Sequence, residues 1–99
     1  MGAARAHLLI QGRVQGVSFR YHTMQEARIL GLTGWVRNLW DGRVEVVLDG
    51  DDESVKQMIE WCQQGPPSAA VENVDVAWEE PTAEYNNFRV RINAGGGSS

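Results

Sequence analysis

The sequence predicts an α+β domain in which two amphipathic helices cover one face of an antiparallel sheet. Several segments of the 99 residues alternate apolar and polar side chains, which is typical of half-buried strands. Two longer segments carry apolar residues every three or four positions, as helices do. Neither helix can bury its apolar stripe alone. The simplest solution places both stripes against one sheet, as in a split βαβ arrangement.

The first strand and the first helix follow one another along the chain. Residues 6–12 alternate as a strand does, whereas residues 1–5 show no pattern and are expected to fray. A helix is predicted over 18–30, with Ser18 as its N-cap and Gly31 in the left-handed position after its last turn. Its predicted apolar stripe consists of Val17, Tyr21, Met24, Ala27 and Leu30.

A hairpin is predicted after this helix. Residues 33–39 and 44–48 both alternate as strands do, and Asp41-Gly42 between them is a strong turn signal. Asn38 lies at the end of the first of these strands. If the first and second strands are neighbours in the sheet, the loop after the first strand and Asn38 open at the same end.

A second helix and two further strands complete the expected fold. Acidic residues at 49–53 open the helix, and Gly65-Pro66-Pro67 stops it. Two strands are then expected over 74–78 and 88–92, with a polar connector between them. The apolar stripe of the second helix consists of Val55, Met58, Ile59 and Cys62.

The length, charge and cysteine content of the chain exclude several classes of protein. The composition predicts one domain, residues 1–93, followed by a flexible Gly/Ser tail at 94–99. The net charge of −4 argues against a large nucleic-acid surface. Cys62 is the single cysteine, so no internal disulfide forms, and the two histidines are too few for a metal cluster. No apolar run approaches the roughly 20 residues of a membrane span. A cytoplasmic monomer without a cofactor is expected.

Residues 10–20 form the candidate functional segment. The chain leaves an apolar run, passes Gly12 and Gly16, and enters the helix at Ser18. The backbone N–H groups of such a loop, with the positive end of the helix dipole, suit an anion. Arg20 falls in the first helical turn, where a cation is unfavourable unless an anion binds there too. The alternative is a tight turn with Arg20 in water.

Two motifs in this sequence resemble those of acylphosphatases. One is the run from Ile10 to Arg20, and the other is Gly34-Trp35-Val36-Arg37-Asn38 followed by Gly42-Arg43-Val44 and Gly50. The resemblance covers nearly the whole domain, from Ala6 to Ile92. It implies a ferredoxin-like α/β sandwich (βαββαβ). It also implies metal-independent hydrolysis of an acyl phosphate to a carboxylate and inorganic phosphate.

The resemblance also implies roles for particular residues. Arg20 binds the phosphate and Asn38 orients the attacking water. The leaving carboxylate has a conjugate acid with a pKa of about 4, so it departs without a strong general acid. What the protein must supply is position and charge. The phosphoryl oxygens are expected to bind the backbone N–H groups of Gln15, Gly16, Val17, Ser18 and Phe19.

The sequence leaves other functions and residue roles open. A non-catalytic module from a larger carbamoyl-phosphate-handling protein would bind phosphate without turning substrate over. An RNA-binding sheet is disfavoured by the acidic charge. Asn38 has a structural alternative as the cap of the hairpin. Ser18 has no base beside it in the sequence, which favours capping over nucleophilic attack.

Overall fold

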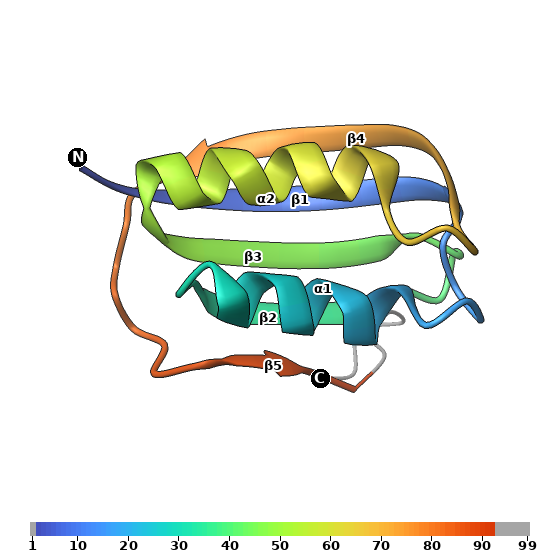
Figure 1. The fold of residues 1–99 in the computed structure, drawn as a ribbon, viewed down its shortest axis with the longest axis horizontal. Helices are drawn as coiled ribbons and strands as arrows, with labels where there is room; N and C mark the ends of the chain where they lie inside the picture. The colour runs from blue at the N-terminus through green and yellow to red at the C-terminus, as the bar shows by residue number, and fades with distance from the viewer. Residues whose placement is uncertain (1, 93–99) are drawn as a thin grey trace.

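Two helices lie on one face of a five-stranded sheet in the computed structural model, which describes residues 2–92 (Figure 1). This confirms the expected α+β, ferredoxin-like fold. The predicted tail, 94–99, lies outside the described residues. The elements are, in order, β1 (Ala3–Arg13), α1 (Phe19–Ile29), β2 (Thr33–Asn38), β3 (Val44–Asp51), α2 (Asp52–Gln64), β4 (Ala70–Glu79) and β5 (Phe88–Val90).

The sheet has the strand order β4-β1-β3-β2-β5. The pairs β1–β3, β1–β4 and β2–β3 are antiparallel, whereas β2 and β5 are parallel. The sheet is therefore mixed, and the expectation of an all-antiparallel sheet is wrong at this edge. The reason is the connector after β4, which crosses one end of the sheet to the opposite edge, so that β5 starts where β2 starts (Figure 1).

β1 begins at Ala3, so the prediction that residues 1–5 fray is wrong for 3–5. β1 is longer than predicted because Arg5 holds its first residues in place. The Arg5 guanidinium binds the carboxylates of Glu79 and Glu84, each at 2.9 Å. These ion pairs join β1 to β4 and to the connector after it, and so hold the beginning of β1 in the sheet.

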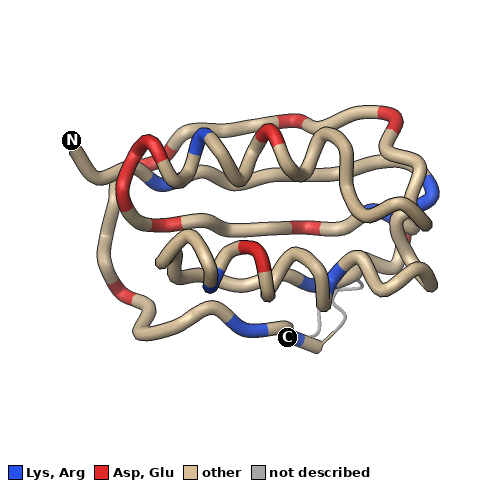
Figure 2. The backbone as a smooth tube through the Cα atoms, in the orientation of Figure 1, with Lys and Arg blue, Asp and Glu red and all other residues tan. Residues whose placement is uncertain are grey.

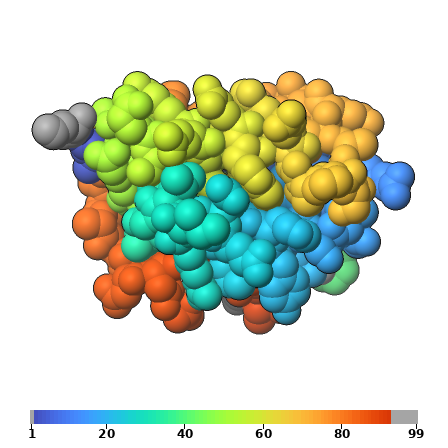
Figure 3. Space-filling model, in the orientation of Figure 1, coloured from blue at the N-terminus to red at the C-terminus, as the bar shows by residue number. Residues whose placement is uncertain are grey.

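The apolar core lies between the sheet and the two helices, which together cover this face (Figure 3). In α2, all four residues of the predicted stripe are buried. Cys62 belongs to this stripe, and burial raises the pKa of its thiol to about 12. At neutral pH the thiol is therefore protonated and acts as an apolar core group.

Four of the five residues of the predicted α1 stripe lie in or against the core, but Tyr21 does not. Phe19, Thr23 and Ala27 are buried, whereas Tyr21 is 63% exposed. The Phe19 ring lies 5.8 Å from that of Trp61, measured between centroids. Burying this large ring at the start of the helix turns the Tyr21 side of α1 outward, because these two residues are about 200° apart around a helix.

Gly34 in β2 allows a close approach to β3. Its φ is +134°, and an added Cβ would lie 1.9 Å from the carbonyl oxygen of Val47. We expect Gly34→Ala to lower the free energy of unfolding by about 3 kcal/mol, since the backbone must move. Gly2→Ala is the matched control, because nothing lies within 4 Å of its added Cβ. Urea unfolding measures both, and equal stability of the two variants would contradict the prediction.

Candidate functional site

The topology brings the segments that carry Arg20 and Asn38 to the same end of the sheet. β1 and β2 are not neighbours, because β3 lies between them. Both are antiparallel to β3, so they run in the same direction and finish at the same end of the sheet. The chain leaving β1 enters α1, whose first turn carries Arg20, and Asn38 is the last residue of β2. α1 packs over β2, so both residues lie at one end of this pair (Figure 1).

The β1–α1 loop, residues 14–18, contains two residues with a left-handed backbone. Gly16 has φ +74° and Ser18 has φ +61°, with Val17 at negative φ between them. Such alternation turns successive N–H groups toward one concavity. Within residues 2–92, the backbone N–H groups of residues 15–19 donate to no other described group. These donors are therefore available to a ligand.

Ser18 occupies the N-cap position of α1, but its side chain makes no capping hydrogen bond. The prediction of a capping hydroxyl is wrong, because a cap needs extended backbone and Ser18 is left-handed. Its carbonyl oxygen instead accepts from the backbone N–H of His22 at 3.1 Å and lies 2.8 Å from His22 Nδ1. The first turn of α1 also contains no acidic residue. The positive end of the helix therefore has no carboxylate of its own.

The side chains of this segment are held from several directions. Phe19 is buried in the core, so only its backbone is left for a ligand. The Ser68 hydroxyl donates to the carbonyl oxygen of Val17 at 3.0 Å. Arg20 is half-buried. The loop is thus tied to the core and to the segment between α2 and β4, which fixes its shape before any ligand binds.

Asn38 carries an unusual buried group. The residue is 6% exposed and lies on the helix-covered face of β2, as Val36 does. Its Oδ1 atom has no hydrogen-bond partner among the described residues, and the same holds for Oγ1 of the fully buried Thr23 on α1. A buried polar atom without a partner costs about 1–3 kcal/mol. Such an atom in a native structure therefore calls for a functional explanation.

The hairpin turn after Asn38 is capped by another residue. Asp41 Oδ1 accepts from the backbone N–H of Arg43 at 3.1 Å, and Oδ2 accepts from the Arg43 guanidinium at 2.9 Å. These hydrogen bonds lower the pKa of the Asp41 carboxyl. The structural alternative for Asn38, a cap of the hairpin, therefore has no support in the hydrogen bonds of the described chain.

Gln15 makes a contact that the sequence did not reveal. Its side-chain Nε2 donates to the carbonyl oxygens of Leu39 at 2.7 Å and Arg43 at 2.9 Å. These two residues flank the hairpin turn that follows Asn38. The sequence assigned only the backbone of Gln15 to the site. A glutamine in a glycine-containing loop gives no signal of a partner 24 residues away.

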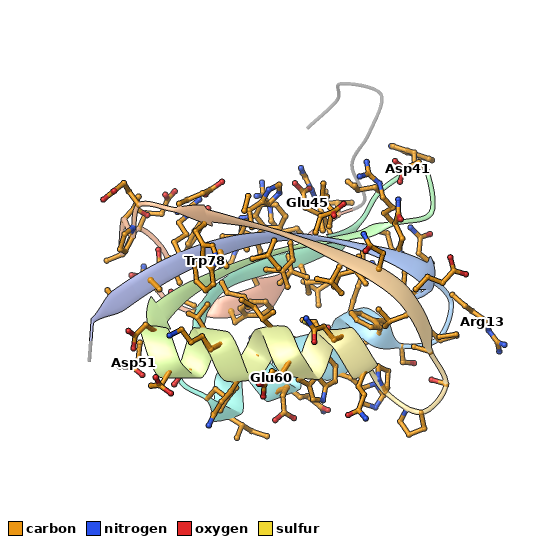
Figure 4. The ribbon with its side chains drawn as sticks, turned by 90° about the horizontal axis from the view of Figure 1, so that it is seen from above. Arg13, Asp41, Glu45, Asp51, Glu60 and Trp78 are labelled. Atoms are coloured by element: carbon orange, nitrogen blue, oxygen red, sulfur yellow. The ribbon has the colours of Figure 1, made fainter. Side chains whose placement is uncertain are left out.

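Charge around this end of the molecule suits an anion. The turn that contains the acidic residues Asp51, Asp52 and Glu53 lies at the opposite end from the β1–α1 loop (Figure 2). Arg13 and Asp41 mark the loop end of the sheet, and Asp51 marks the other end (Figure 4). The acidic residues at the start of α2 therefore lie far from the β1–α1 loop, at the other end of the sheet.

Other parts of the chain offer less to the predicted chemistry. A hollow of about 510 Å³ is lined by Trp35, Tyr85 and Arg91, away from the predicted site. On the open face of the sheet, Glu45 binds His7 and Arg37, and these hydrogen bonds outweigh burial and lower its pKa. An ionised carboxylate in the middle of this face is unfavourable for RNA.

Residues 2–92 contain neither a metal-binding cluster nor a helix suited to span a membrane. No group of three or more His, Cys, Asp or Glu side chains in this range is arranged to hold a metal ion. No helix in it is both long enough and apolar enough to cross a membrane.

Comparison with known proteins gave consistent matches. The acylphosphatase family model matches residues 6–90. An acylphosphatase of Pelotomaculum thermopropionicum is 50% identical over 90 residues, covering 91% of this chain and 98% of that relative. The solved structure of an acylphosphatase from Coxiella burnetii has a TM-score of 0.85 at 43% identity, covering 90% and 93% of the two chains. Full-length HypF has a TM-score of 0.84 at 26% identity, covering 96% of this chain but 13% of HypF.

Proposed function

Because this chain belongs to the acylphosphatase family and hydrolyses acyl phosphates, we propose that Arg20 and the backbone amides of residues 15–19 bind the phosphoryl group and that Asn38 orients the attacking water. The amides include those of Gln15 and Phe19 at the two ends of the loop. Each role rests on a separate feature of the described chain.

The phosphoryl group binds where the β1–α1 loop meets the N-terminus of α1. The left-handed conformations at Gly16 and Ser18 support this, since they turn the loop amides together. Ser18 is a non-glycine residue in this region, which costs about 1–3 kcal/mol, and such strain clusters at functional sites. Arg20 adds a planar fork of donors that matches two phosphoryl oxygens. Its position against the helix dipole becomes favourable once the anion is bound.

The attacking water is held by Asn38, and the single observation that carries this step is its buried Oδ1 atom, which has no hydrogen-bond partner within residues 2–92. A carboxamide accepts from the water through its oxygen, which aligns a lone pair of the water with phosphorus. A buried polar atom without a partner favours an ordered water beside it.

The hydrolysis itself needs no metal in this proposal. As the water oxygen bonds to phosphorus, the bond between phosphorus and the acyl oxygen breaks, and its electron pair leaves on the carboxylate. The proton released from the water passes to phosphate or to solvent. Because carboxylate is a weak base, general acid catalysis contributes little. The chain supplies orientation and charge neutralisation, which are the main contributions to phosphoryl transfer.

We also propose that the enzyme acts as a cytoplasmic monomer. Every proposed site residue comes from one domain, residues 1–93, so the reaction requires no second subunit. A cytoplasmic monomer without nucleic-acid or membrane partners agrees with the acidic charge and with the single, buried cysteine.

Hydrolysis of benzoyl phosphate in the presence of a chelator tests the proposal. We expect undiminished turnover after the metal is removed, with inorganic phosphate as a competitive inhibitor, since substrate and product share the loop. The assay also decides the alternative of a non-catalytic module, which binds phosphate without turnover. Loss of activity on chelation that returns with an added divalent ion would contradict the metal-free reaction.

A further inference from the structure

We infer that Gln15 is a positioning residue, whose side chain holds Asn38 in a fixed place relative to the phosphate-binding loop. The inference rests on the roles proposed above for the loop and for Asn38. Gln15 then contributes twice to the site. Its backbone belongs to the loop that binds the phosphoryl group, and its side chain holds the element that carries the water-orienting group.

The contacts of the Gln15 amide are specific. Nε2 carries two N–H donors, and each has its own acceptor, the carbonyl oxygens of Leu39 at 2.7 Å and Arg43 at 2.9 Å. Leu39 is bonded to Asn38, and its own N–H donates to the Arg43 carbonyl at 2.8 Å. The glutamine thus binds the residue that follows β2 and the residue that precedes β3, and the first of these is bonded to Asn38.

The site needs such a link because its two halves come from strands that are not neighbours. β3 lies between β1 and β2, so their ends are about 10 Å apart at the usual strand spacing. No ladder hydrogen bond can join the loop directly to the end of β2. Among the described residues, the two bonds from Gln15 are the only hydrogen bonds that join residues 14–18 to residues 38–43. A misplacement of 1 Å in a reacting group costs about 10²-fold in rate.

The decisive variant is Gln15→Met, which keeps the length of the side chain and removes both donors. We expect kcat to fall by about 10- to 100-fold, because the hairpin moves relative to the loop. The inhibition constant of inorganic phosphate should change less than about threefold, because Arg20 and the loop are one continuous segment. Gln57→Met is the matched control. Gln57 is an exposed glutamine of α2, outside the segment of residues 10–20, and it makes none of these bonds.

A double-mutant cycle separates a positioning role from a merely structural one. If Gln15 acts through Asn38, the double variant Gln15→Met/Asn38→Ala should be no slower than Asn38→Ala alone. The inference would be overturned if the losses of kcat in the two single variants multiplied in the double variant. It would also be overturned if Gln15→Met left kcat unchanged, or if it weakened phosphate binding by the same factor as kcat. Full activity of Asn38→Ala would instead refute the proposed role of Asn38 itself. If circular dichroism shows that Gln15→Met does not fold, Gln15→Leu replaces it, because leucine also lacks both donors and adds no charge to the loop.

Discussion

Arg20→Gln should lower kcat/KM for an acyl phosphate by about 10³-fold, equivalent to about 4 kcal/mol of transition-state stabilisation. Glutamine keeps a polar side chain but loses the charge and the two-pronged geometry of the guanidinium. Charge on the phosphoryl oxygens is present in the bound substrate and in the product. The inhibition constant of inorganic phosphate should therefore rise at least tenfold as well. Steady-state kinetics with phosphate as inhibitor measure both effects.

Arg13→Gln is the matched control for this variant. Arg13 is exposed, lies at the same end of the sheet and loses the same charge on substitution (Figure 4). If Arg20 acts by direct contact, the activity of the Arg13 variant should stay within about threefold of that of the wild type. Added salt should remove the remaining difference between the Arg13 variant and the wild type. Equal losses in the two variants would mean that general positive potential, and not contact, accounts for the effect. An Arg20→Gln protein with full turnover would remove Arg20 from the reaction.

The order and type of the helices and strands could be predicted from local sequence patterns. The predictions that were wrong concern contacts between residues far apart in the sequence. The predicted apolar stripe of α2 is confirmed, because all four of its residues are buried in the core. In α1 the apolar Tyr21 points outward and the polar Thr23 is buried, because Phe19 determines which side of the helix meets the sheet. Periodicity likewise detects β5 but says nothing about its partner. The parallel pairing with β2 depends on the path of the connector.

The candidate site divides in the same way. The glycine loop, Arg20 and Asn38 are visible as two motifs, and the fold brings their segments to one end of the sheet. Two features were hidden. The left-handed backbone of Ser18 replaces the expected cap, and the Gln15 side chain binds the hairpin. Both depend on where the loop sits against distant residues, such as Ser68, and no local rule in the sequence carries that information.

Asn38→Ala should reduce kcat by about 10²-fold or more, because a preorganised group that acts on the reacting atoms contributes on this scale. The affinity for inorganic phosphate should change less than about threefold, since Asn38 acts on water and not on the anion. The free energy of unfolding should fall by less than about 1 kcal/mol, because the buried Oδ1 atom has no described partner to lose. Activity, phosphate inhibition and urea unfolding of one preparation give all three values.

The combination of these effects is what identifies a water-orienting group. A structural asparagine would lose stability and activity together, whereas a phosphate ligand would lose affinity along with turnover. Asn73→Ala, in the exposed part of β4, serves as the control and should leave kcat unchanged. Stability at a functional site is commonly sacrificed for activity, so a variant that is inactive yet as stable as the wild type supports the assignment. A large loss of stability in Asn38→Ala with proportionate loss of activity would place Asn38 in the framework of the hairpin instead.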